Sequence, residues 1–448
     1  MSPRFLAKAY ASDERLFSGR FFAQGPVRPA SGDRVGVVLL VPGAPERKED
    51  VRDYLYHRLM LPPGAQSVAR LWLRHVQSRL SARMLYRQVI SEYSSIGGGL
   101  SINRLNREQS RELERRLNGR TDLPAGVRFS VYVASPFGSP DMARAAQAMA
   151  ADGVTHVVLL PMFPQYATET SGRALATWEA LTKTGAIAAR PTVSVGPFAT
   201  REKYLKALNE RIEQALQRFP KHIRPGVELL FAAHGIPAGH DPHNRDPYSC
   251  LVHNTVDAIM HARRRDRAFS LSFVRSGRWG DTVSQDLQDR VRGMAKDGTR
   301  AVLVVPVDHV TEQFDTAYLL DVHMRAVAEK AGIPHYHVVS GLNCHPLFVE
   351  CLADLVGEQV SGAASDYRTL PAGDGAVRPG TSVLMPVAVC PRASHEGADG
   401  PGGTTETFCH TCPVSAAHGR GTGELLHQRP VHRPSGGGNN ALFLEPGV

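Results

Sequence analysis

One histidine of this chain stands where a buried strand is expected to end. The apolar run 229–233 leads directly into His234, and Gly235 then lets the chain turn. Such a run, bounded by turn residues, is typical of a strand buried on both faces of a parallel sheet. Ligands of open α/β sheets bind just beyond the carboxyl ends of the strands. His234 is therefore either a base or metal ligand, or a hydrogen-bonded histidine at the edge of the core.

A second group of polar side chains follows another expected strand, which ends at Pro306. The loop after this strand contains Asp308, His309, Glu312 and Asp315. The loop after the first strand adds His240, His243 and Asp246. A base and a carboxylate at two strand ends of one domain are the usual components of proton transfer or metal handling. The alternative is that Glu312 and Asp315 cap the following helix and stabilise its positive end.

Apolar segments at regular intervals predict the strands that position these side chains. They are 35–41, 127–133, 154–160, 193–195, 229–233, 271–274, 301–305 and 335–339. The segments with helical periodicity are 51–59, 68–85, 103–117, 142–151, 201–219, 254–264, 283–297, 318–331 and 347–360. Strands that alternate with helices of this length predict βαβ units and parallel sheets, and hence an α/β fold.

The two halves of the chain echo each other in sequence. LLVPGAP (39–45) parallels FAAHGIP (231–237), and HVVLLPMFPQYATET (156–170) parallels AVLVVPVDHVTEQFDT (301–316). This repeat predicts two similar doubly wound domains whose parallel sheets face a central cleft, where a large, flat or extended ligand would bind. We therefore divide the chain into an irregular amino-terminal extension (1–34), a first domain (35–198), a second domain (199–360) and an irregular, low-complexity carboxyl-terminal tail (361–448).

Composition narrows the class of protein. The chain has 448 residues, of which 42% are apolar and 21% charged, as expected for a globular protein with more than one domain. No apolar run approaches the roughly 20 residues of a membrane span, and no export signal precedes residue 35, so we expect a cytoplasmic protein. The net charge of +9 is scattered through amphipathic segments. It does not predict a nucleic-acid partner, and it leaves peripheral contact with an anionic membrane open.

Seven motifs, in the family's order and at similar spacing, resemble those of the ferrochelatases. They are GVVLLVPGAP (36–45), IGGGLSINRLNREQ (96–109), LLPMFPQYATETSG (159–172), LLFAAHGIP (229–237), DPYSC (246–250), VVPVDHVTEQFDTAYLLD (304–321) and LNCHPLF (342–348). No single motif is specific, but seven in order make the resemblance strong. It covers about residues 35–360.

The resemblance implies a lyase that inserts Fe²⁺, its metal substrate, into a porphyrin in haem biosynthesis. Two Rossmann-like domains would grip the porphyrin, either protoporphyrin IX or coproporphyrin III, in the cleft. The family's histidine falls on His234, which would accept pyrrole protons or bind the incoming Fe²⁺. The family's glutamate falls on Asp315, which would share that role. The residues implied to bind the porphyrin are Gly97, Gly98, Gly99, Phe163, Tyr166, Phe137 and Tyr318.

The sequence departs from the family pattern in the loop that follows residue 306. Asp315 is one methylene shorter than the expected glutamate, Gln313 stands where a histidine is usual, and Glu312 stands where an aspartate is usual. These departures keep two alternatives open. One is a non-catalytic tetrapyrrole-binding paralogue, and the other is a related chelatase for cobalt or nickel.

The tail contains three cysteines that could hold a metal. Cys390 is followed by the CxxC pair Cys409 and Cys412, a spacing found in metal sites. Some ferrochelatases carry a [2Fe–2S] cluster on a carboxyl-terminal cysteine group, and the resemblance makes these residues its candidate ligands. A zinc site completed by His410 and a tail with incidental cysteines are the alternatives.

Overall fold

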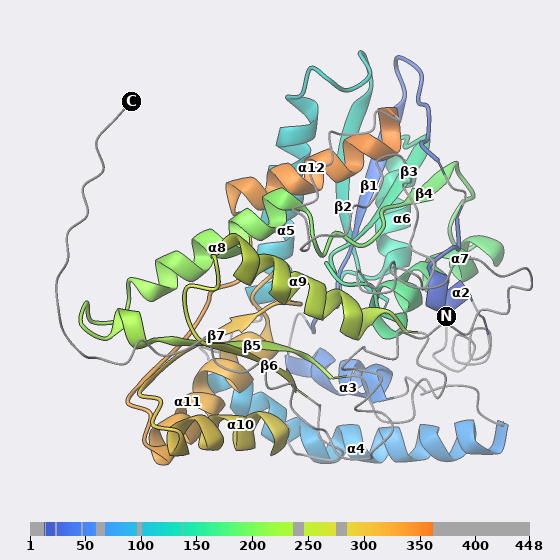
Figure 1. The fold of residues 1–448 in the computed structure, drawn as a ribbon. Helices are drawn as coiled ribbons and strands as arrows, with labels where there is room; N and C mark the ends of the chain where they lie inside the picture. Colours follow the sequence, from blue (N-terminus) through green and yellow to red (C-terminus); the bar gives the residue numbers. More distant parts are fainter. Residues whose placement is uncertain are drawn as a thin grey trace, which may run out of the picture.

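The chain folds around two parallel sheets of four strands each, with helices on every face (Figure 1). The α/β fold expected from the sequence is therefore confirmed. The computed structural model describes residues 13, 15–22, 25–45, 48–59, 68–95, 101–136, 138–235, 246–274 and 285–361.

The first sheet has the strand order β2-β1-β3-β4, and all neighbouring strands run parallel. Its strands are β1 (Arg34–Leu40), β2 (Arg128–Ala134), β3 (His156–Pro161) and β4 (Thr192–Ser194). The two central strands, β1 and β3, consist mostly of valine and leucine and are buried along almost their whole length. Continuous apolar runs of this kind are required where helices cover both faces of a sheet.

The second sheet repeats the first, with the strand order β6-β5-β7-β8 and parallel pairing throughout. Its strands are β5 (Glu228–His234), β6 (Phe269–Val274), β7 (Ala301–Pro306) and β8 (His335–Val338). The register repeats as well. Leu40 lies opposite Pro161 in the first sheet, and Ala232 lies opposite Pro306 in the second. This is the alignment that the two echoing sequence segments predict.

Helices form one inner and two outer layers around the sheets (Figure 1). The inner layer, between the sheets, consists of α5 (Ser101–Asn118), α8 (Glu202–Leu216), α9 (Tyr248–Ala262) and α12 (Pro346–Ser361). The outer helices of the first sheet are α6 (Met142–Ala151) and α7 (Arg173–Lys183), and those of the second are α10 (Gln285–Lys296) and α11 (Met324–Ala331). A separate apolar cluster fills each outer interface.

The inner apolar cluster is shared by both halves. It joins side chains of β1, such as Val37, with side chains of β5, such as Phe231. Polar contacts cross the same interface. The buried amide of Gln165 donates to the hydroxyl of Thr255 at 2.9 Å and to the carbonyl of Val307 at 3.2 Å. The two halves are thus packed on a common core.

The amino-terminal segment is attached to the first sheet. Its short helix α2 (Arg15–Ser18) carries Arg15, whose guanidinium contacts Glu179 of α7 at 2.7 Å. Further along, the backbone amide of Val27 donates to the carbonyl of Gln359 in α12 at 2.8 Å. The described part of this extension therefore contacts both α7 and α12.

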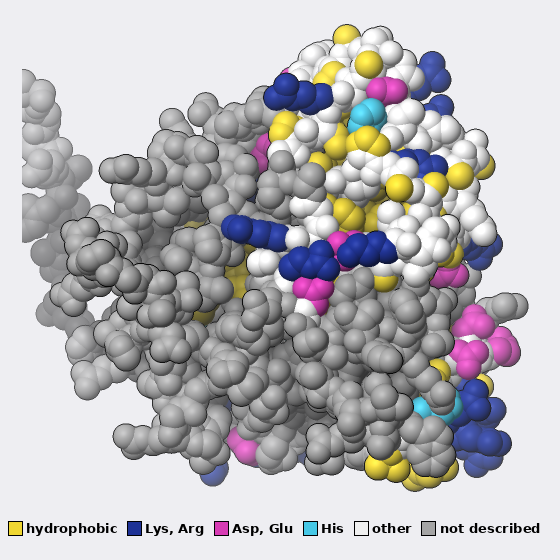
Figure 2. Space-filling view, turned by 90° about the vertical axis from the view of Figure 1, so that its right-hand side faces the viewer, with side chains coloured by type: hydrophobic (Ala, Val, Ile, Leu, Met, Phe, Trp, Pro, Cys, Tyr) yellow, Lys and Arg dark blue, Asp and Glu magenta, His cyan; other side chains and the backbone are white. Residues whose placement is uncertain are grey.

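A helical segment lies on the surface beside the second sheet and consists of η1 (Lys48–Asp50), α3 (Val51–Leu59) and α4 (Val68–Ser95). The helix α4 exposes several large apolar side chains, namely Leu73, Val76, Leu80 and Met84. Elsewhere on the described surface, lysine and arginine side chains are interleaved with acidic ones on the face shown in Figure 2. None of the described helices is both long and apolar enough to span a bilayer.

A π-helical segment follows the same central strand in each half. After β3 comes η2 (Thr168–Gly172), and after β7 comes η4 (Asp315–His323), which continues into α11. A short 3-10 turn, η3 (Arg224–Gly226), precedes β5. Since π-helices are rare and are frequent at functional sites, the loops after β3 and β7 are the first places to look for chemistry.

Candidate functional site

His234 lies at the carboxyl end of β5, as the sequence predicts. The five residues before it, 229–233, are buried, whereas the His234 side chain is 37% exposed. Its backbone amide donates to Oδ2 of Asp308 at 2.9 Å, and its ring Nδ1 lies 2.7 Å from the same oxygen. Two contacts to one oxygen hold both the backbone and the ring of His234 in one orientation.

Asp308 is the centre of the site. It follows β7, and its side chain is only 8% exposed. Besides the two contacts with His234, Oδ2 accepts the hydroxyl proton of Tyr248 at 2.8 Å, and Oδ1 lies 2.6 Å from Nδ1 of His309. Four donors therefore surround one carboxyl group, which is what a buried carboxylate needs.

The charge of Asp308 determines the proton positions around it. Burial alone would raise the pKa of this carboxyl, but the adjacent imidazoles of His309 and His234 outweigh burial, so its pKa lies well below the usual value. An ionised carboxylate can only accept, so Nδ1 of each histidine must donate to it. Burial, and then the charge of Asp308, raise the pKa of Tyr248, which therefore keeps its hydroxyl proton.

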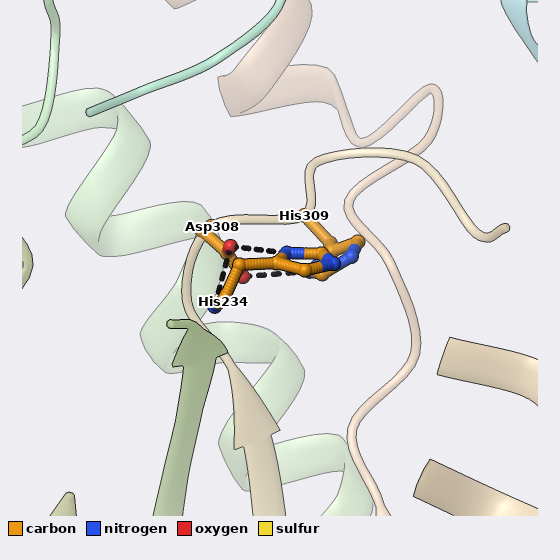
Figure 3. A group of neighbouring side chains, drawn as sticks. All are labelled: His234, Asp308 and His309. Atoms are coloured by element: carbon orange, nitrogen blue, oxygen red, sulfur yellow. Dashed lines mark hydrogen bonds and ion pairs between the residues drawn. The ribbon is translucent and has the colours of Figure 1, made fainter. Parts of the chain in front are cut away.

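His309 places a second imidazole beside the first. Its ring centroid lies 4.4 Å from that of His234, and the two planes are inclined by 32°. Figure 3 shows both rings reaching away from Asp308 toward the same side. Potential ligand atoms of His234, Asp308 and His309 lie within 4.8 Å of one another. This His–Asp–His group can accept protons, and it could also bind a metal ion.

Asp315, the second predicted catalytic residue, is the first residue of η4. Its side chain lies outside the described part of the structure, so its contact with His234 stays a prediction. Glu312 is half-buried, and its backbone amide donates to Oδ1 of Asn343 at 3.1 Å. The residue that precedes η4, Phe314, makes no side-chain capping hydrogen bond.

Three of the predicted porphyrin-binding residues can be placed. Phe163 is half-buried in the loop after β3. Tyr166 is 4% exposed, and its hydroxyl donates to the carbonyl of Leu16. The ring of Tyr318 stacks on Phe314, with centroids 5.2 Å apart. Contact of these three side chains with a porphyrin stays a prediction.

Other predicted residues lie outside the described part of the chain. They are Gly97, Gly98, Gly99, Phe137, His240, His243, Cys390, Cys409, His410 and Cys412.

Asp246, which the sequence groups with the site histidines, joins the two halves of the fold. Its Oδ2 accepts from the backbone amide and the hydroxyl of Thr168 at 2.9 and 2.6 Å. Its Oδ1 accepts from the backbone amide of Tyr248 at 3.0 Å, at the start of α9. The carboxylate thus orients the helix that carries the Tyr248 hydroxyl to Asp308.

Sequence reasoning did not identify Tyr248 as part of the site, and it did not pair His234 with Asp308. The register of the second sheet contains the missing information. Ala232 lies opposite Pro306, so His234 and Asp308 each stand two residues beyond that pair. An aspartate two residues after a proline-terminated strand is the signal that, with the register, would have revealed the contact.

Comparison with known proteins finds ferrochelatases. The profile of the ferrochelatase family matches residues 34–360. The ferrochelatase of Gloeobacter violaceus is 30% identical over 335 residues, covering 73% of this chain and 98% of that protein. The ferrochelatase of Synechococcus elongatus is 31% identical over 324 residues, covering 72% and 82%. Among solved structures, the sirohydrochlorin chelatase SirB of Bacillus subtilis subspecies spizizenii, in complex with cobalt, aligns with a TM-score of 0.40 and 11% identity over 74% of this chain and 97% of that one.

Proposed function

The chain belongs to the ferrochelatase family, and from that premise we propose that it is a lyase that inserts Fe²⁺ into a porphyrin in haem biosynthesis. Membership of the family supports metal insertion into a tetrapyrrole. The proposal adds iron as the metal and protoporphyrin IX or coproporphyrin III as the acceptor.

The observation that carries the proposal is the contact between His234 and the buried carboxylate of Asp308. Because Nδ1 of His234 donates to Asp308 at 2.7 Å, the basic lone pair of the unprotonated ring is on Nε2. A porphyrin must lose two pyrrole N–H protons when a divalent metal enters. His234 supplies a base for this loss at a strand end, where ligands of α/β sheets bind.

Asp308 makes His234 a better proton acceptor. When Nε2 takes a proton from the pyrrole, the ring becomes an imidazolium whose positive charge lies directly against the Asp308 carboxylate. The carboxylate is buried and already ionised, so this stabilisation requires little rearrangement of the site. Asp308 thereby acts as a positioning residue, in the same way as the aspartate that orients the histidine of a serine protease triad.

The remaining roles in the proposal follow the family pattern. Asp315, at the start of η4, shares metal delivery or the removal of the second proton with His234. The macrocycle is bordered by Phe163 and Tyr166 after β3 and by Tyr318 within η4. The family pattern adds Phe137, Gly97, Gly98 and Gly99.

A direct assay tests the proposal. Purified protein is mixed anaerobically with Fe²⁺ and either protoporphyrin IX or coproporphyrin III, and haem formation is followed by absorbance. We expect metallation of at least one porphyrin, with its rate lost in His234→Ala and kept in His345→Ala, which alters a buried histidine paired with Glu210 rather than with Asp308. Porphyrin binding without metallation would instead identify a tetrapyrrole-binding paralogue, and turnover in His234→Ala would refute the role of that residue.

The cysteine group of the tail is proposed as the ligand set of a [2Fe–2S] cluster, from its CxxC spacing and from the resemblance to ferrochelatases that carry such a cluster. Cys390, Cys409 and Cys412 supply three thiolates, and the cluster requires a fourth ligand. Visible absorption and iron analysis of the protein as purified test this. A colourless, iron-free protein that retains zinc after dialysis would favour the zinc site.

A further inference from the structure

Two imidazoles share one carboxylate in this site, and each uses the same ring nitrogen to do so. Nδ1 of His234 binds Oδ2 of Asp308, and Nδ1 of His309 binds Oδ1. Histidines that bind metals almost always donate their other ring N–H to a carboxylate or carbonyl, which leaves the second nitrogen to the metal. Asp308 makes this arrangement twice, for two neighbouring rings.

Among the residues that the structure describes, none makes a hydrogen bond to the second ring nitrogen of His309. The side chain is only 6% exposed, and its Nε2 is fully buried with no hydrogen-bond partner among the described residues. An unsatisfied buried polar atom is unfavourable, so a ligand that binds this nitrogen would stabilise the site. Figure 3 shows the far edge of this ring on the same side as the far edge of His234.

We propose that His309 Nε2, together with His234 Nε2, binds the divalent metal substrate before it is transferred to the porphyrin. This inference rests on the proposed function only in naming the metal as the substrate. Imidazole nitrogen suits Fe²⁺, Co²⁺ and Zn²⁺, and both nitrogens carry lone pairs once Nδ1 of each ring is committed to Asp308. The metal gains two neutral nitrogen ligands, and the negative charge of Asp308 lies behind them.

The same chain offers a matched counter-example. His345 is as buried as His309, with a side chain 6% exposed, and it also has a buried ring nitrogen, Nδ1, with no hydrogen-bond partner in the described structure. Its Nε2 lies 3.2 Å from Glu210, whose side chain is 55% exposed. No second histidine shares that carboxylate within the described residues. His345 therefore has the unsatisfied nitrogen of His309 without its paired ring, and we expect no metal there.

Titration of the porphyrin-free protein with Co²⁺, followed by calorimetry and by visible absorption, tests the proposal. The full chain carries Cys409→Ser and Cys412→Ser so that tail thiolates do not compete for Co²⁺. In this background we expect His309→Phe and His234→Ala each to weaken Co²⁺ binding by about tenfold or more. Mutating a residue that only hydrogen-bonds to a metal ligand already weakens metal binding by about this much, so removing a ligand should cost at least as much. His345→Phe serves as the control and should bind Co²⁺ like the parent protein.

The outcomes separate this inference from the proposed function. Failure of the parent protein to bind Co²⁺, or unchanged binding in His309→Phe, overturns the metal-binding role whether or not the enzyme metallates porphyrin. His309→Gln, which keeps a polar side chain at the buried position, replaces His309→Phe if the latter fails to fold. Loss of Co²⁺ binding in both site variants but not in His345→Phe supports the inference even if no porphyrin is metallated.

Discussion

Replacing Asp308 by asparagine changes the charge of the site while keeping its shape. Three of the four donors meet Oδ2, and one, Nδ1 of His309, meets Oδ1. We expect the asparagine carbonyl to take the Oδ2 position, because it then keeps the two contacts of His234 and that of Tyr248. The amide group must then face His309, so Nδ1 of that ring becomes an acceptor and its proton moves to Nε2.

The size of the effect follows from these contacts. The imidazolium that forms on His234 loses a charge-assisted hydrogen bond to a carboxylate, which contributes about 1.5–3 kcal/mol. Because the ring of His234 is charged only after it has taken the proton, the lost hydrogen-bond energy raises the activation free energy. At about 1.36 kcal/mol per tenfold change in rate, kcat then falls roughly 10- to 150-fold. The same change places a proton on Nε2 of His309, so metal binding there should also be lost.

Steady-state metallation of porphyrin by Fe²⁺ under anaerobic conditions, measured across pH, checks this prediction. We expect Asp308→Asn to lower the plateau of kcat and to move its acid limb to lower pH, because the imidazolium has lost its partner. Asp246→Asn is the control for loss of a buried carboxylate that contacts Thr168 and Tyr248 but not the site imidazoles, so the acid limb of its kcat profile should keep its position. A kcat and pH profile of Asp308→Asn equal to those of the unaltered protein would refute the reasoning.

Three other predictions concern stability. The pKa of Asp308 is depressed below its ordinary 3.8, so its carboxylate stabilises the fold above that pH, and this stabilisation is lost as the pH falls through the lower folded value. The free energy of unfolding in urea should therefore depend less on pH below 3.8 in Asp308→Asn than in the unaltered protein. An equal pH dependence in the two proteins would contradict this. Gln165→Leu removes two buried hydrogen bonds and should cost about 1–3 kcal/mol of unfolding free energy in urea, whereas an unchanged midpoint would show that they contribute nothing. Gly43 has φ +73°, and an added Cβ would lie 2.2 Å from Oγ of Ser135, while Gly185 has φ +74° and open space around it. Gly43→Ala should therefore lower Tm by more than Gly185→Ala, and equal shifts would exclude the clash.

The sequence predicts the sheets of this fold well because buried parallel strands have an unambiguous pattern. Continuous valine and leucine runs such as 301–305, stopped by proline, are compatible with few other structures. The observed β7, Ala301–Pro306, differs from that expectation by one residue. The echo between the two halves also aligns Pro161 with Pro306, as the strand register does.

The site was harder to predict, because a contact between two strand ends depends on register. The residue types of His234 and Asp308 do not determine the register in which β5 pairs with β7. A shift of that register by one residue would turn one of the two side chains to the other face of the sheet. The segment after β7 was expected to form a helix from residue 318, whereas η4 already begins at Asp315 as a π-helix. The wider turn of a π-helix leaves no signal in a pattern read with helical periodicity.

The position of α12 has a consequence for how the protein is made. This helix packs against α5 of the first half, where Phe348 and Leu352 share a core with Leu113 and Leu117. The ribosome adds about 240 residues between the ends of the two helices, which takes roughly 12–50 s at about 5–20 residues per second. During translation the apolar face of α5 stays uncovered until α12 has been synthesised. The first half of the nascent chain therefore cannot complete its apolar core before the last described helix is made.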